Sequence, residues 1–214
     1  MEISVDQMYQ IENNGHNMGF LKKFMMENAG AAAVRKLAEK TNLEKKKILI
    51  FVGMGNNGGD GLVMARHLSG YDSLVTVVLL GSPEKIKTEE SNWNWSILKK
   101  MPSVNLISGN DTSFDFQPDV VIDGILGTGI SGQIREPYAS AINYINKLKC
   151  LKFAVDVPSG LNPDTGETAN ICVKSDLTVT FHKMKRGISK RKDLTGELYT
   201  EKIGIPPEAE KGII

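Results

Sequence analysis

The residue types best suited to chemistry lie in a glycine-rich segment, Gly53 to Gly61. It contains the spacing G-x-G-x-x-G together with the polar residues Asn56, Asn57 and Asp60. Glycines let the backbone approach a pyrophosphate, and the N–H groups of a following helix point towards it. The same spacing also occurs in tight turns that bind nothing, so the two interpretations have equal weight. The amides and the carboxylate, which can bind hydroxyl groups or an ion, indicate more than phosphate binding.

Two further aspartates follow or interrupt apolar runs. Asp123 lies in the run Val121 to Ile125, and Asp156 lies between Val155 and Val157. Burying a carboxylate among valines costs free energy unless the carboxylate is paired. One such aspartate on its own would be interpreted as the cap of a turn or helix. Open α/β sheets, however, bind ligands at the carboxyl ends of their strands. We therefore predict that Asp60, Asp123 and Asp156 face one pocket.

Alternating apolar segments must position these residues. Helical spacing predicts two N-terminal helices between Ile3 and about Ala38, with a break at Asn13 to Gly15. Strands are predicted at 48–52, 74–80, 104–107, 119–125, 153–157, 177–181 and 198–203, and later helices at 61–68, 88–100 and 136–149. This alternation predicts one domain over residues 1–214, with a doubly wound parallel sheet, helices on both faces and the N-terminal helices as an added element.

The composition excludes several classes of protein. With 41% hydrophobic and 24% charged residues the chain is an ordinary globular one, and its net charge of +1 produces no field that would attract nucleic acid or an anionic membrane. The N-terminus has no secretion signal, and no apolar run approaches the ~20 residues of a membrane span. We therefore expect a cytoplasmic protein with neither nucleic acid nor membrane as a partner.

A few residues allow more than one interpretation. Cys150 and Cys172 lack the spacing of a redox motif or a disulfide framework and are expected to be reduced thiols. The three histidines lack the ligand spacing of a zinc site. Four apolar residues of the N-terminal helices could pack on their own sheet or form a homodimer surface: Phe20, Phe24, Met25 and Met26.

Five segments together resemble the NAD(P)HX epimerase family, also described as the YjeF N-terminal domain. The matching strings are NAG at 28–30, GMGNNGGDGLVMARHL at 53–68, VIDGILGTGISGQIREP at 121–137, AVDVPSGLNPDTG at 154–166 and DLTVTFHKMKRG at 176–187. They occur in order over nearly the whole chain, and NNGGDG with D-x-PSG is far more specific than a glycine fingerprint. The resemblance implies a Rossmann-like three-layer α/β/α sandwich with a mostly parallel sheet.

The resemblance also implies an activity, which is the interconversion of the R and S epimers at C6 of hydrated NADH and NADPH for cofactor repair. By matching position, the substrate would contact Asn56, Asn57, Gly58, Gly59, Asp60, Gly127, Thr128, Gly129, Ile130, Ser131, Gly132, Gln133 and Asp156. A potassium ion would correspond to Asn57, Asp123 and Ser159, all of which offer the oxygen ligands of a hard cation. The sequence places no residue that selects between NADHX and NADPHX.

The chain departs from the family pattern in two places. The first helix, with the pattern DQMYQIENN, gives no basis for a role of Asp6 or Glu12. Many bacterial relatives continue into a dehydratase domain, whereas this chain ends at Ile214, so we expect a separate dehydratase to complete the repair.

Epimerisation can proceed by loss of hydroxide and addition of water to the opposite face of the ring. Asp156 is the predicted acid/base residue, because desolvation could raise its pKa towards the working range, and Asp60 is the alternative. Asp123 would stay ionised beside the cation. Two other functions compete with this one: a non-catalytic nucleotide-binding module, which would not need three carboxylates, and a dehydrogenase, which is disfavoured because no ribose carboxylate ends the second strand.

Overall fold

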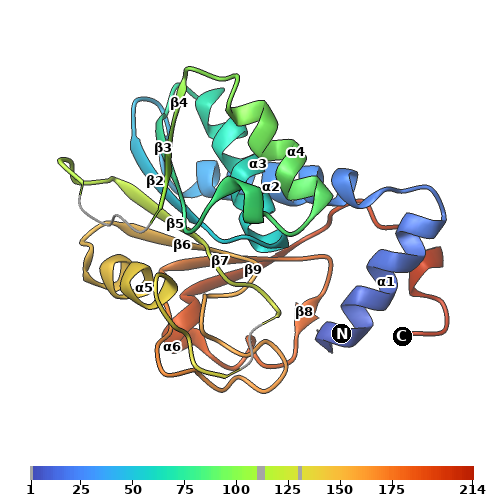
Figure 1. The fold of residues 1–214 in the computed structure, drawn as a ribbon. Coiled ribbons are helices and arrows are strands. Elements are labelled where there is room, and N and C mark those ends of the chain that lie inside the picture. Colours follow the sequence, from blue (N-terminus) through green and yellow to red (C-terminus); the bar gives the residue numbers. More distant parts are fainter. Residues whose placement is uncertain (1, 110–113, 130–131) are drawn as a thin grey trace.

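A seven-stranded parallel sheet forms the centre of the molecule, shown as a computed structural model in Figure 1. The structure describes residues 2–109, 114–129 and 132–214. The strands of this sheet are β2 Lys47–Val52, β3 Leu74–Leu79, β4 Val104–Ser108, β5 Val120–Gly124, β6 Leu151–Val155, β7 Leu177–Phe181 and β9 Glu197–Glu201. Their order is β4-β3-β2-β5-β6-β7-β9. The strands from β2 to β4 are added on one side of β2, and those from β5 onward are added on its other side. The position between β2 and β5 is therefore a topological switch point, where ligands bind in open α/β sheets.

Strand β2 is buried on both faces, as its unbroken apolar run predicts. Ile48, Ile50 and Val52 belong to the core on one face of the sheet, whereas Leu49 and Phe51 belong to the core on the other. All five side chains are fully buried. Alternation along one strand therefore feeds two separate cores, which is typical of a parallel sheet covered on both sides.

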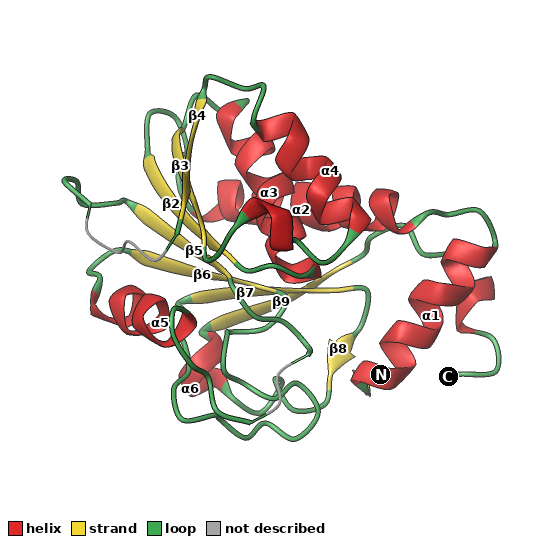
Figure 2. Ribbon diagram, viewed as in Figure 1, coloured by secondary structure: helices red, strands yellow, loops and turns green. Residues whose placement is uncertain are grey.

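Helices cover both faces of the sheet, so the predicted Rossmann-like three-layer α/β/α architecture is confirmed (Figure 2). The helices are α1 Val5–Asn17, α2 Lys22–Lys40, α3 Asn56–Ser69, α4 Glu89–Leu98, α5 Tyr138–Lys147 and α6 Lys192–Thr195, with short 3₁₀ turns η1 Pro83–Lys85 and η2 Pro207–Glu210. Helices α2, α3 and α4 lie on one face, and α5 and α6 lie on the other. Within the described residues, no helix has the length and apolarity needed to cross a bilayer.

Helix α2 is part of a layer rather than an added element, which corrects the prediction for the N-terminal helices. It packs directly on α3, and the contact is close because Gly30 lies where a Cβ would be 2.5 Å from the Cβ of Val63. Met25 and Met26 are buried in this layer, and half-buried Phe20 packs against the core. Of the four residues considered for a dimer surface, Phe24 is the exposed one, with 48% of its surface accessible.

Helix α1 lies apart from the sheet, next to η2 and the C-terminus (Figure 1). The predicted break at Asn13 to Gly15 is wrong, because these residues continue α1 and Gly15 is buried against Met25. The helix ends instead before Gly19, whose φ of +98° places it in the left-handed region that glycine tolerates. Before α1, strand β1 Glu2–Ile3 pairs in parallel with β8 Met184–Lys185.

Other boundaries differ by a few residues, and two of these differences affect the site. Helix α3 begins at Asn56 rather than at Gly61, so most of the glycine-rich segment is helical. Strand β6 ends at Val155, so Asp156 follows the strand rather than lying inside it. Strand β9 covers Glu197–Glu201 rather than 198–203. The remaining predicted strands and helices are confirmed, and both cysteines are free thiols as expected.

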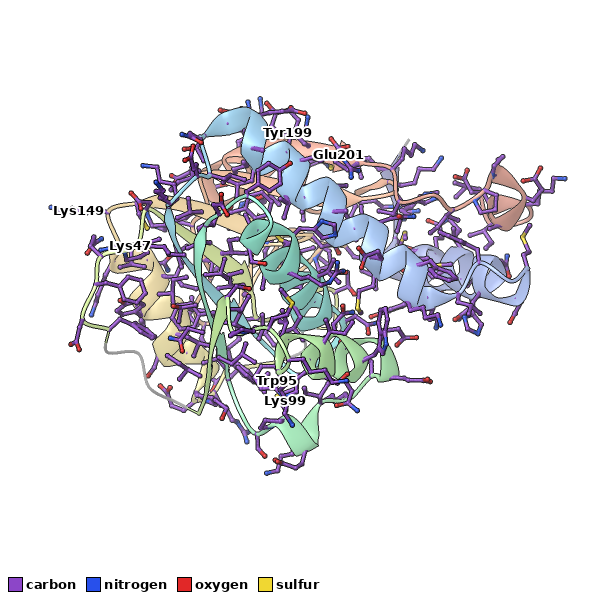
Figure 3. The ribbon with its side chains drawn as sticks, turned by 90° about the horizontal axis from the view of Figure 1, so that it is seen from above. Lys47, Trp95, Lys99, Lys149, Tyr199 and Glu201 are labelled. Atoms are coloured by element: carbon purple, nitrogen blue, oxygen red, sulfur yellow. The ribbon has the colours of Figure 1, made fainter. Side chains whose placement is uncertain are left out.

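The edge strand β9 is covered by the C-terminal half of α2. Tyr199 and Glu201 extend from β9 beside α2 (Figure 3). The ammonium groups of Lys36 and Lys40 each lie 4.8 Å from the centre of the Tyr199 ring, and Lys36 also pairs with Glu201 at 3.4 Å. Charged residues at an edge strand disfavour pairing with another sheet.

Candidate active site

A cavity of about 110 Å³ opens at the carboxyl ends of the central strands. It is lined by α1, the N-terminal half of α2, the first turns of α3, the turn after β5, Asp156 after β6 and Lys185 on β8. Asn56, Asn57, Asp60, Gly127, Thr128 and Asp156 are the predicted substrate-binding residues that line it. Three separate segments thus meet at the switch point of the sheet, as the sequence predicts.

Asp156 is held by a strained backbone and by three hydrogen-bond donors. Its φ is +61°, and its N–H donates to the carbonyl oxygen of Val179 at 2.8 Å. Its Oδ1 accepts from Thr180 Oγ1 at 2.8 Å, from the N–H of Phe181 at 3.2 Å and from Lys185 Nζ at 2.5 Å. A left-handed conformation is uncommon for a residue with a side chain, and such strain is concentrated at functional sites. The donors stabilise an ionised carboxylate whose orientation is fixed.

Lys185 lines the cavity and pairs with Asp156, and sequence reasoning missed it. Its side chain is 1% exposed, and its ammonium group also donates to Thr180 Oγ1 at 2.9 Å and to the carbonyl oxygen of Phe181 at 3.2 Å. A buried lysine needs such a partner, because an unpaired charge is expensive to desolvate. The segment DLTVTFHKMKRG contains this residue, but nothing in its spacing shows that β8 returns it to Asp156.

Asp60 lies on the first turns of α3 and faces the same cavity. Burial raises its pKa well above the ordinary value, and the negative charges of Asp156 and Glu12 raise it further, whereas Lys185 lowers it. Asp60 therefore favours the protonated form much more than an exposed aspartate does. The cavity thus holds two carboxyl groups in different surroundings: Asp156 is paired with Lys185, whereas burial and neighbouring negative charges raise the pKa of Asp60.

Glu12 on α1 is the second residue that sequence reasoning missed. Its carboxyl group lines the cavity, and burial raises its pKa to about 7 against an opposing effect of Lys185. The charge of Asp156 adds to the rise, and Lys22 opposes it. A carboxyl group with a pKa near neutrality can both give and take a proton under physiological conditions.

Of the three residues matched to a potassium ion, Asn57 lines the cavity, whereas the buried Asp123 and Ser159 do not. The prediction that Asp123 faces the same pocket as Asp60 and Asp156 is therefore wrong, because its carboxylate is turned to the Ser159 backbone and hydroxyl group. Ser159 donates to both oxygens of Asp123, from Oγ at 2.6 Å and from its N–H at 2.7 Å. Burial raises the pKa of Asp123 to about 6, and the hydrogen bonds from Ser159 oppose this rise. Within the described part of the chain, the buried side-chain oxygen and nitrogen of Asn57 have no hydrogen-bond partner. An amide oxygen without a partner, a carboxylate and a hydroxyl group are the types of ligand that a hard cation takes.

Several residues matched to the substrate lie elsewhere. Gly58 and Gly59 are buried within α3, where a Cβ on Gly58 would be 2.1 Å from the carbonyl oxygen of Gly53. Close packing of α3 against its surroundings therefore explains why these two positions are glycine. Gly129, Gly132 and Gln133 do not line the cavity and are exposed. Ile130 and Ser131 lie outside the described residues. Contact of these glycines and of Gln133 with a substrate stays a prediction.

The start of α3 supplies hydrogen-bond donors for an anion. Gly55 is the N-cap residue and offers no side chain to the first turn of the helix. The N–H groups of a first turn lack partners within their own helix, and the helix dipole adds positive potential there. This helix end lies at the switch point, which favours the phosphate-binding interpretation of the glycine-rich segment over a turn that binds nothing.

The chain is similar to known proteins over nearly its whole length. Residues 22–187 match the family described as YjeF-related protein N-terminus. A protein of Nitrosopumilus maritimus named NAD(P)H-hydrate epimerase is 78% identical over the full length of both chains. A protein of the same name from Cenarchaeum symbiosum is 65% identical, again over the full length of both. The crystal structure of a yeast protein superposes with a TM-score of 0.84 and 25% identity, covering 98% of this chain and 91% of the yeast chain.

Proposed function

The chain belongs to the family described as YjeF-related protein N-terminus, and from this membership we infer that it is an NAD(P)H-hydrate epimerase, an isomerase acting in cofactor repair. One structural observation carries the inference. A single cavity at the switch point unites the Asp156–Lys185 pair with Asp60, whose pKa is raised. A non-catalytic binding module has no need of a proton carrier beside an ion pair.

The cavity is suited to the reacting end of the substrate. Its volume of about 110 Å³ is well below the ~300–1,000 Å³ of pockets that enclose drug-sized ligands. Only the hydrated nicotinamide ring and its neighbouring atoms would therefore enter. The phosphates would lie at the start of α3, beside Gly127 and Thr128 of the turn after β5.

The carboxylate of Asp156 is placed to exchange a proton with the oxygen atom bonded to C6 of the nicotinamide ring. Its described hydrogen bonds all end on Oδ1, so Oδ2 is the oxygen that can face the substrate. In the proposed reaction the C6–O bond breaks as the leaving oxygen takes up a proton and departs as water. The ring becomes an iminium ion, water adds to C6 on the other face, and its extra proton passes to a carboxylate. Lys185 holds Asp156 in position throughout.

Asp60 is the alternative acid/base residue. Its raised pKa makes it the better proton donor to a leaving hydroxyl group. If Asp156→Asn keeps near-normal epimerisation and Asp60→Asn abolishes it, the two roles are exchanged.

We also propose a potassium ion at Asn57, Asp123 and Ser159. When bound, the ion would supply a fixed positive charge beside the substrate's polar groups. Asn57 would contribute its unpartnered side-chain oxygen, and the charge of the ion would favour the ionised form of Asp123 against the burial that raises its pKa. A test is the melting temperature, Tm, in potassium compared with choline at equal ionic strength. Potassium should raise the Tm of the wild type but not of Asp123→Asn, and an equal Tm in both salts would contradict the ion site.

The remaining parts of the proposal concern partners and location. An epimerase does not remove water, so a separate dehydratase would return the S epimer to usable cofactor. A homodimer through the exposed side of α2 around Phe24 and a cytoplasmic location stay predictions.

The deciding experiment starts from separately purified R and S epimers of NADHX and NADPHX. The protein alone should bring either epimer to the same equilibrium mixture faster than buffer does, as followed by chromatography. Water labelled with heavy oxygen should enter the substrate at the rate of epimerisation, because the C6–O bond breaks. Unchanged epimer ratios with both substrates would refute the proposed function.

A further inference from the structure

Helix α1 presents one face to the cavity. Val5, Met8, Tyr9 and Glu12 line it, and their spacing places them on the same side of a helix. Glu12 is the carboxyl group of this face. On the sheet side Asp156 follows β6, and Asp60 on α3 and Glu90 on α4 also line the cavity. A flat ring in the cavity would thus have strand ends on one side and α1 on the other.

The placement of α1 is fixed by contacts along its length. Ser4 and Gln7 form a capping box at its start, and Val5 N–H donates to Asp164 Oδ1 at 2.8 Å. The hydroxyl groups of Tyr9 and Thr128 are hydrogen-bonded to each other at 2.9 Å, which links α1 to the turn after β5. A group carried by this helix is therefore held at a defined position, as acid/base catalysis requires.

The carboxyl group of Glu12 has charges around it but no structural partner. Lys22 on α2, Asp60 on α3, Glu90 on α4, Asp156 and Lys185 face the same cavity. Among the described residues its raised pKa arises from burial and charge alone, with no hydrogen bond contributing. A structural buried carboxyl group is normally hydrogen-bonded or paired. Glu12 instead leaves its oxygens free for a ligand.

We propose that Glu12 is a second acid/base residue of the epimerase, acting on the ring face opposite Asp156. The inference rests on the proposed function and deepens it. When water departs from the α1 side, Glu12 gives its proton to the leaving hydroxyl group, and Asp156 takes the proton of the water that adds from the sheet side. In the reverse direction the two carboxyl groups exchange these roles. One carboxylate on one side of a ring cannot reach both faces.

The test compares Glu12→Gln with Asp6→Asn, which removes an exposed carboxyl group from the same helix outside the cavity. Epimerisation of purified R and S epimers is followed in both directions as a function of pH. Glu12→Gln should lower kcat by about 10²–10⁴-fold in both directions with KM unchanged. The limb of the wild-type pH profile near neutrality should disappear. Asp6→Asn should keep both the rate and the profile.

A second variant separates chemistry from folding. Glu12→Asp shortens the side chain but still titrates, so it should keep the neutral limb of the profile while kcat falls. If Glu12→Gln keeps the wild-type rate and pH profile while Asp156→Asn is inactive, Glu12 is not an acid/base residue and the inference is overturned. If the wild type itself does not epimerise either substrate, the proposed function fails instead, so the two failures are distinguishable.

Discussion

The buried position of Asp60 suits a residue that transfers protons, but it lowers the stability of the folded protein when the carboxyl group is ionised. Its pKa is raised in the folded protein, so the native state binds more protons than the unfolded state between the ordinary value and the raised one. Stability therefore falls as the pH rises through that interval. We predict that Asp60→Asn raises the Tm by about 2–4 °C at about pH 8 and by less at about pH 5.

Thermal unfolding of the wild type and Asp60→Asn over this pH range measures the effect. Asp193→Asn is a suitable control, because Arg191 lowers the pKa of Asp193 and the sign is reversed. Removing that charge should not stabilise the protein at high pH. A lower Tm of Asp60→Asn throughout the range would show that the carboxyl group is structurally paired.

The residues of the site could be predicted only in part. Asn57, Asp60 and Asp156 were recognisable because each lies close to the end of an apolar strand, where ligands bind. Lys185 and Glu12 gave no such signal, because each approaches Asp156 through a strand or helix far away along the chain. The strained backbone of Asp156 also has no counterpart in the sequence.

At the scale of elements, the α2–α3 contact depends on one small residue. A Cβ on Gly30 would lie 2.5 Å from both Cβ and Cγ1 of Val63 and 3.0 Å from the carbonyl oxygen of Asp60. Gly30→Ala gains helix propensity but forces the two helices apart. We expect a net loss of about 1–3 kcal/mol in the free energy of unfolding, as for other overpacked cores.

Chemical denaturation measures this loss, and Gly55→Ala is the matched control. Nothing lies within 4 Å of a Cβ built on Gly55, and its backbone is extended. Because Gly55 is the N-cap residue, where glycine is preferred over alanine, the control should lose less than about 1 kcal/mol. Since α3 carries Asp60, Gly30→Ala should also lower kcat, and equal stability of both variants would contradict the close contact.

The order and type of the elements were largely predictable, because long apolar runs and helical spacing report burial directly. Their boundaries were not. Gly58 and Gly59 suggest a turn in the sequence, yet they lie inside α3, where small residues allow close packing. Gly15 likewise continues α1 against Met25. Packing overrode local preference in both cases.

At the scale of the molecule, the C-terminal segment holds α1 over the cavity. Asn14 Nδ2 donates to the carbonyl oxygen of Ala209 at 3.0 Å, and Gln7 Nε2 donates to that of Ile213 at 3.1 Å. We predict that deletion of residues 206–214 increases amide hydrogen exchange in α1 but not in β2. The rate of epimerisation should fall because Tyr9 and Glu12 lose their fixed positions.

Deletion of Ile214 alone provides the comparison, because it leaves both hydrogen bonds to α1 in place. Exchange in α1 and the rate should then remain at the wild-type level. Equal protection of α1 in the two truncated proteins would show that the C-terminal segment does not position it.

The short pairing of β1 with β8 connects Lys185, on β8, to helix α1, which carries Glu12. Ile3 is the register partner of Lys185, and α1 begins two residues after Ile3. Any displacement of the amino terminus is therefore transmitted to the lysine that orients Asp156 as well as to Glu12. A bulky tag fused before Glu2 would disturb the pairing of β1 with β8. An affinity tag for kinetic work therefore belongs elsewhere on the chain.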